Sequence, residues 1–164
     1  MRNVFLSYQI FDFIAIFCPF YPTPQKIVAQ KPKTISSKEE FEVIKTHCMQ
    51  GANMLRRLEN FEDEPLLQTA YDIARWHHER WDGRGYPDGL KGNDIPISAQ
   101  IVSLADVYDA LTSERCYKEA FSHETAMRMI LNGECGAFNP LLLECLTDIQ
   151  AELQKKSQNI TVNR

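Results

Sequence analysis

Residues 77–89 read His77-His78-Glu79-Arg80-Trp81-Asp82-Gly83-Arg84-Gly85-Tyr86-Pro87-Asp88-Gly89. Two adjacent imidazoles stand where a helical pattern ends, and a loop containing glycine and proline follows at once. Imidazole is a common protein ligand for transition metals, and a glycine-containing backbone can bend closely around a ligand. This stretch therefore indicates a ligand-binding site where a helix meets a loop.

The chain on both sides of this stretch has helical periodicity and no alternating strand pattern. Apolar residues recur at steps of three or four between Phe41 and Leu58, whereas the glycines and prolines of residues 82–96 predict a long irregular loop. Five residues are expected to cap or open helices: Ser37, Pro65, Ser98, Ser122 and Asn139. The sequence therefore predicts an all-α domain with five recognisable helices after Ser36.

Two of these helices are predicted to carry site residues on or near their inward faces. In the second, Leu66, Ala70, Ile73 and His77 follow at helical spacing, so that the imidazole points inward. In the third, one face is formed by Ile101, Ala105 and Tyr108, with Asp106 close to the apolar side.

The composition is that of a soluble globular protein: 164 residues, 44% hydrophobic and 24% charged. A formal net charge of -4 argues against general binding to DNA or RNA. The five cysteines form no CxxC pair, which favours a reducing cytoplasm and argues against a structural zinc site built on thiolates.

Three segments differ in character. Residues 1–23 form an atypical hydrophobic stretch, residues 24–154 form the domain proper, and residues 155–164 form a polar tail that is expected to fray. The first segment is too interrupted for a secretory signal and falls short of the roughly 20 apolar residues of a membrane span. We therefore expect an amphipathic or buried segment there, and no membrane association.

Residues 77–83, followed by Gly85-Tyr86-Pro87-Asp88-Gly89, resemble the signature of the HD-GYP family, metal-dependent phosphohydrolases that hydrolyse cyclic di-GMP. The resemblance runs from about Pro24 to about Leu153 and includes Lys45-Thr46-His47 and residues 105–113 and 115–118. The family's His-Asp pair, which would be expected before Pro24, has no counterpart, because this chain contains no His-Asp dipeptide. The resemblance thus implies an incomplete or degenerate HD-GYP module.

The resemblance implies that His47, His77, His78 and Asp106 are metal ligands. A mixed imidazole and carboxylate set suits iron or manganese, with zinc as an alternative. The resemblance also implies that a bridging aspartate, a histidine and a lysine of the family's site are missing, so that hydrolysis by two metals is doubtful and the catalytic residues stay unassigned.

Three further residues are implied to bind substrate: Arg115, Lys118 and Tyr86. A guanidinium and an ammonium suit the phosphates of a cyclic dinucleotide, and a tyrosine ring can stack on a base. The Gly85-Tyr86-Pro87 loop is also implied to contact cyclic di-GMP synthase domains, although its tyrosine could instead fold back over the core. Three functions remain open: a cyclic di-GMP phosphodiesterase module, a non-hydrolytic dinucleotide-binding or adaptor module, and a fragment without an independent role.

Overall fold

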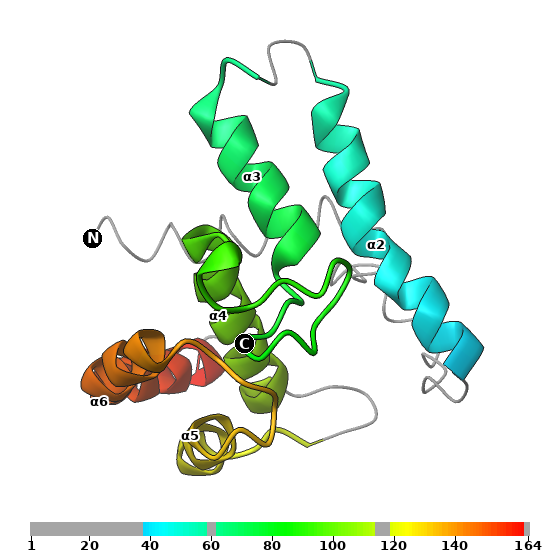
Figure 1. The fold of residues 1–164 in the computed structure, drawn as a ribbon. Helices are drawn as coiled ribbons and strands as arrows, with labels where there is room; N and C mark the ends of the chain where they lie inside the picture. The colour runs from blue at the N-terminus through cyan, green and yellow to red at the C-terminus, as the bar shows by residue number, and fades with distance from the viewer. Residues whose placement is uncertain (1–37, 59–61, 114–118, 163–164) are drawn as a thin grey trace.

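The computed structural model describes residues 38–58, 62–113 and 119–162. Within these ranges there are five α-helices, one short 3-10 helix and no strand, which confirms the predicted all-α fold (Figure 1). The helices are α2 (Lys38–Arg56), α3 (Pro65–Trp76), α4 (Ile97–Thr112), α5 (His123–Leu131) and α6 (Pro140–Val162), with the 3-10 helix η1 at Gly92–Asp94.

The helices are arranged as two groups on either side of α4. Helices α2 and α3 lie side by side at one end of the domain, and α5 and α6 lie at the other (Figure 1). Helix α3 packs against α4, and α4 packs in turn against α5. The loop between α3 and α4 therefore emerges where the two groups meet.

Each group has its own apolar cluster of buried residues. The cluster between α2 and α3 consists of Ala52, Leu55, Ala70 and Tyr71. The second cluster consists of Leu104, Leu111, Ala126, Met127, Ile130, Phe138 and Leu146. Partly buried leucines of α6 pack against the second cluster, so most of the large apolar side chains lie in the half formed by α4, α5 and α6.

Three of the five predicted helix starts are confirmed. Pro65 begins α3, as expected for a residue that lacks an amide hydrogen and has a fixed φ. The Ser122 side chain accepts a hydrogen bond from the amide of Thr125, and Asn139 Oδ1 accepts one from the amide of Leu141 at 3.0 Å. Ser37 lies outside the described residues.

The predicted cap at Ser98 is wrong. Helix α4 already begins at Ile97, because Pro96 occupies the cap position with φ -55° and ψ 137°. A proline in this conformation leads the chain directly into the first turn without a side-chain hydrogen bond. Ser98 therefore lies inside the helix.

The predicted inward faces are only partly correct. Leu66 is 76% exposed and Ile101 is 50% exposed, and Ala105 is also exposed, whereas Ala70 and His77 are buried. The buried residues of α4 are Ala99, Gln100, Val102, Ser103, Leu104 and Leu111. Helix α4 has neighbours on two sides, α3 and α5, and spacing along one helix cannot predict which residues face each neighbour.

Two segments are more regular than expected. The loop between α3 and α4 contains the 3-10 helix η1, and α6 continues to Val162. Residues 155–162, for which the sequence predicts fraying, form the last turns of α6.

Candidate metal centre

Four potential metal ligands meet where α2 approaches the end of α3. His47 and Cys48 are consecutive residues of α2, His77 is the C-cap residue of α3, and His78 follows it. One potential ligand atom from each lies within 4.8 Å of those of the other three. His47, Cys48 and His77 are buried, and His78 is half-buried. The structure therefore brings together three of the four predicted metal ligands and adds a thiol.

Backbone carbonyls fix the orientation of two of the imidazoles. Nδ1 of His47 lies 2.6 Å from the carbonyl oxygen of Ile44, and Nδ1 of His77 lies 2.8 Å from that of Ile73. A carbonyl oxygen only accepts hydrogen bonds, so each Nδ1 must carry the proton. A neutral ring then has its lone pair on Nε2, and such second-shell hydrogen bonds are typical of metal-binding histidines.

The two Nε2 atoms lie 3.3 Å apart. When both rings are neutral, two lone pairs face each other at this distance without a hydrogen between them. A cation, either a proton or a metal ion, is therefore needed to make this contact favourable.

Burial keeps two of the histidines neutral near pH 7. Desolvation, followed by the nearby His47, lowers the pKa of His77 to about 4. Desolvation, followed by the neighbouring imidazoles, lowers the pKa of His78 to about 2. Neutral imidazole is the form that coordinates a metal, so the donor set fits a divalent transition metal.

Asp106 is not part of this group of four. It lies in α4, half-buried, where its charge favours the protonated form of Arg80. The guanidinium of Arg80 donates to Ser103 Oγ at 2.6 Å and lies over the ring of Phe138. Desolvation nevertheless lowers the pKa of Arg80 below its ordinary value.

Tyr86 covers one side of the histidine group. Its ring centroid lies 4.8 Å from that of His78, with an angle of 32° between the planes. The Tyr86 ring also makes an edge-to-face contact with Phe41 of α2, with 6.1 Å between the ring centroids, and Lys45 Nζ lies 5.9 Å from the tyrosine ring centroid. The half-buried ring of Tyr86 therefore lies beside His78.

Two carboxylates hold the loop that carries Tyr86. Buried Glu79 accepts hydrogen bonds through Oε1 from the amides of Asp88 and Gly89, at 2.7 and 3.0 Å. Asp88 in turn binds Arg75 in a bidentate ion pair and accepts a hydrogen bond from Trp76 Nε1 at 2.7 Å. Burial raises the pKa of Glu79, whereas the Arg75 hydrogen bond lowers that of Asp88. Asp88 thus ties the far end of the loop to α3, and Glu79 closes the loop on itself.

Gly85 allows the same loop to pass directly over the backbone that follows the histidines. A Cβ atom at this position would lie 2.3 Å from Glu79 Cα and 2.4 Å from the amide nitrogen of Arg80. Neither backbone atom can move by a side-chain rotation. Glycine is therefore required here by close approach of two chain segments.

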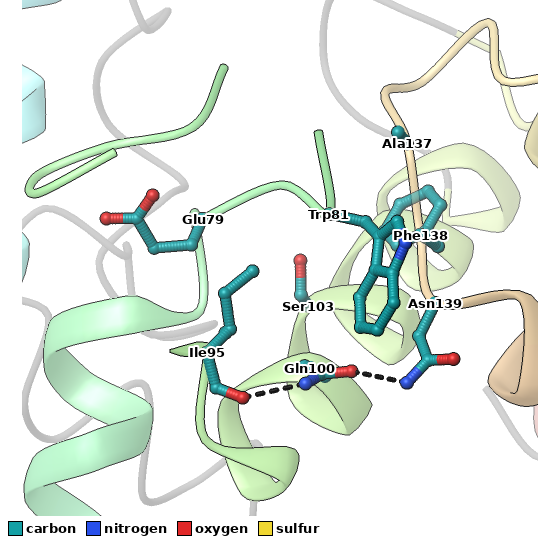
Figure 2. Close-up of a pocket in the computed structure, with 8 residues that line it drawn as sticks. All are labelled: Glu79, Trp81, Ile95, Gln100, Ser103, Ala137, Phe138 and Asn139. Atoms are coloured by element: carbon teal, nitrogen blue, oxygen red, sulfur yellow. Dashed lines mark hydrogen bonds between the residues drawn. The ribbon is translucent and has the colours of Figure 1, made fainter. Parts of the chain in front are cut away.

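A small recess lies on the α4 side of the loop (Figure 2). Ile95 O, the Gln100 side chain and the Asn139 side chain form a hydrogen-bonded chain along it, with distances of 2.7 and 2.8 Å. The recess has room for about one water molecule, so it suits solvent and not a dinucleotide.

The sequence patterns missed Cys48 and Glu79. Cys48 was assigned only to the apolar stripe of its helix, and the absence of a CxxC pair argued against thiolate ligands. Its position directly after His47 was the available signal. The role of Glu79 leaves no signal in the sequence, because its hydrogen-bond partners are the backbone amides of Asp88 and Gly89, and every residue except proline has such an amide. The predicted substrate residues Arg115 and Lys118 lie outside the described residues.

This all-α fold places a buried histidine cluster at a helix end, where its donor atoms could hold a metal ion. The sequence profile of the HD domain matches residues 20–137. The chain therefore belongs to the HD domain family, and its relatives are consistent with the HD-GYP branch.

Several phosphodiesterases are similar to this chain. A probable cyclic di-GMP phosphodiesterase of Vibrio cholerae is 45% identical over 108 residues, which are 65% of this chain and 24% of that protein. A cyclic di-GMP phosphodiesterase of Thermotoga maritima is 41% identical over 73% of this chain and 31% of its own length. A 3'3'-cGAMP-specific phosphodiesterase of Vibrio cholerae is 36% identical over 74% of this chain and 22% of its length. The chain thus spans less than a third of each of these relatives.

None of the described helices is both long enough and apolar enough to cross a bilayer.

Proposed function

We propose that this chain is an HD-GYP phosphodiesterase module that acts on a cyclic dinucleotide, with His47, His77 and His78 holding a divalent metal. The observation that carries the proposal is the pair of Nε2 atoms 3.3 Å apart, each on a ring whose Nδ1 donates to a carbonyl. A divalent metal would contribute Lewis-acid activation and neutralisation of charge on the phosphodiester.

The choice of substrate rests on relatives and on Tyr86. Proteins named as cyclic di-GMP and 3'3'-cGAMP phosphodiesterases match over most of this chain. Tyr86 presents an aromatic ring next to His78, at a place where a base could stack beside the metal. By resemblance, Arg115 and Lys118 supply the cationic groups for the phosphates, and the Gly85-Tyr86-Pro87 loop contacts synthase domains in a cytoplasmic signalling pathway.

A second candidate is a module that binds the dinucleotide without hydrolysing it. The observation that favours it is the lack of any His-Asp dipeptide, together with the position of Asp106 outside the clustered group. Three imidazoles and a thiol can hold one ion, whereas cleavage by a pair of metals needs bridging carboxylates.

The test measures metal content, dinucleotide affinity and hydrolysis of the purified chain after anaerobic loading with iron, manganese or zinc. Hydrolysis of cyclic di-GMP supports the first candidate, and binding without product supports the second. The absence of both binding and hydrolysis would overturn the proposed function.

Variants separate the metal from the substrate contacts. His77→Ala should lose most of the metal, whereas Arg115→Ala should keep the metal and bind the dinucleotide about tenfold more weakly or worse, the loss expected when a charged hydrogen bond is removed. His123→Ala is the matched control, because His123 bonds the Tyr108 hydroxyl at 2.8 Å and is not one of the clustered groups. Full metal loading of His77→Ala would show that the proposed site does not exist.

A further inference from the structure

We propose that Cys48 is a fourth ligand of the metal centre, so that His47, Cys48, His77 and His78 form a four-coordinate site that selects zinc over iron and manganese. This inference rests on the metal site of the proposed function and specifies its chemistry. It changes the ligand set expected from the sequence, because a thiolate takes the place expected for the Asp106 carboxylate.

The distances within the group agree with this geometry. Tetrahedral zinc, with Zn–N near 2.05 Å and Zn–S near 2.3 Å, requires nitrogen pairs about 3.3 Å apart and a sulfur about 3.6 Å from each nitrogen. The Nε2 atoms of His47 and His77 lie 3.3 Å apart, and Cys48 Sγ lies 3.5 Å from His47 Nε2. Two edges of a zinc tetrahedron are therefore already present.

The remaining ligand needs only a small movement. All the ligand atoms lie within 4.8 Å of one another, so the widest pair must close by no more than about 1.5 Å to reach a tetrahedral edge. His78 is half-buried and follows the end of α3, and small changes in its torsions can provide such a shift. Its partial exposure also leaves a path by which an ion can enter.

The Cys48 thiol accounts for a preference for zinc that imidazole ligands alone would not produce. Imidazole accepts zinc, copper, iron and nickel, whereas thiolate favours zinc among the common divalent ions of the cell. Cys48 is fully buried, and an isolated thiolate at a buried position would cost desolvation free energy. The thiol therefore loses its proton only when a cation binds beside it. Manganese, which prefers oxygen ligands, is disfavoured by this set.

The experiment uses the full chain and cobalt as a spectroscopic substitute for zinc. Cobalt-loaded protein is expected to show a thiolate-to-cobalt charge-transfer band in the near ultraviolet together with the visible bands of a four-coordinate ion. Loss of a second-shell group already weakens metal binding by about 10- to 100-fold, so Cys48→Ser and Cys48→Ala should weaken zinc binding by about 100-fold or more and abolish the band.

Cys145→Ser is the matched control, because Cys145 is an exposed thiol in α6 and its replacement should change neither zinc affinity nor the band. The spectrum of the unsubstituted protein decides the question even when a Cys48 variant fails to fold. Cobalt binding without the charge-transfer band, or unchanged zinc affinity in a folded Cys48 variant, would overturn the inference and leave a three-histidine site intact. Failure of the unsubstituted protein to bind zinc or cobalt would overturn this inference and the metal site of the proposed function together.

Discussion

The helix pair α2 and α3 and the group α4, α5 and α6 differ in how their interiors are filled. Two of the four buried residues that form the α2–α3 cluster among the described residues are alanines. The other group buries larger side chains, among them Met127, Ile130 and Phe138, and packs further leucines of α6 around them.

The proposed metal ligands lie in the half whose apolar cluster is the smaller of the two among the described residues. His47 and Cys48 belong to α2, which packs mainly against α3, and His77 ends α3. Apolar burial stabilises by roughly 25 cal/mol per Å², so a cluster rich in alanine contributes less than one built from large side chains. The difference teaches that, among the described residues, the larger apolar cluster and the proposed metal ligands lie in different halves of the domain.

The largest expected effect comes from disturbing the loop that links α3 to α4. Gly85→Ala would place a Cβ atom 2.3 Å from Glu79 Cα, so either the loop or the histidine-bearing backbone must move. We expect a loss of more than about 4 kcal/mol in the free energy of unfolding, measured by urea denaturation. Gly92→Ala is the control, because a Cβ there meets nothing within 4 Å and only the positive φ of 59° opposes it. Equal losses for the two variants would contradict the close-approach argument.

The comparison of the two clusters predicts unequal costs for similar truncations. Ile130→Ala, at a fully buried position of the larger cluster, should lower the free energy of unfolding by about 3 to 4 kcal/mol. Leu55→Ala, equally buried in the smaller cluster, should cost about 2 to 3 kcal/mol, because its partly exposed neighbours can close over the space. Both values come from urea unfolding of metal-free protein. A larger loss for Leu55→Ala than for Ile130→Ala would show that the smaller cluster contributes more to stability than the larger one.

Metal binding should stabilise the α2–α3 half more than the α4–α6 half, because the proposed ligands lie in α2 and at the end of α3. Zinc at about 100 times its dissociation constant should raise the free energy of unfolding by about 2.7 kcal/mol. Hydrogen exchange followed by mass spectrometry should slow in α2 and at the end of α3, and change little in α5 and α6 (Figure 1). Chelation should reverse the effect. Uniform protection of both groups would show that the ion stabilises the whole domain as one unit.

The smallest effect concerns the ion pair between Asp88 and Arg75. The hydrogen bond from Arg75 places the pKa of Asp88 below its ordinary value of 3.8, so the folded state binds the proton less readily than the unfolded chain does. The stabilisation is therefore fully present above pH 3.8 and is lost as the pH falls through the lower, folded-state value.

Asp88→Asn removes this charge and should cost no more than about 1 kcal/mol at pH 7, because the pair is partly exposed to solvent. The difference in stability between Asp88→Asn and the unsubstituted protein should shrink as the pH is lowered below 3.8. Glu134→Gln, which removes an exposed ion pair with Arg128 at 2.8 Å in the other half, is the control for general charge effects. A difference that stays constant with pH would assign the Asp88 contribution to its neutral hydrogen bonds.

Local chemistry allowed the helices to be predicted from the sequence, whereas three of the four proposed ligands were implied by the resemblance to the HD-GYP family. Pro65 opens α3 through its fixed φ, and the side chains of Ser122 and Asn139 accept hydrogen bonds from amides within their own turns, so these roles depend on nearby residues alone. His77 and His78 stand beside a loop whose glycines and prolines are visible in the chain. The same local reasoning misplaced the start of α4, where Pro96 and not Ser98 sets the boundary.

Only the tertiary structure decided which atoms meet. His47 and His77 are separated by 30 residues, and their Nε2 atoms approach to 3.3 Å because α2 packs on α3. That packing also placed the Cys48 thiol in the group and left Asp106 outside it. Residue spacing fixes directions within one helix, whereas distances between helices depend on how whole side-chain surfaces fit together.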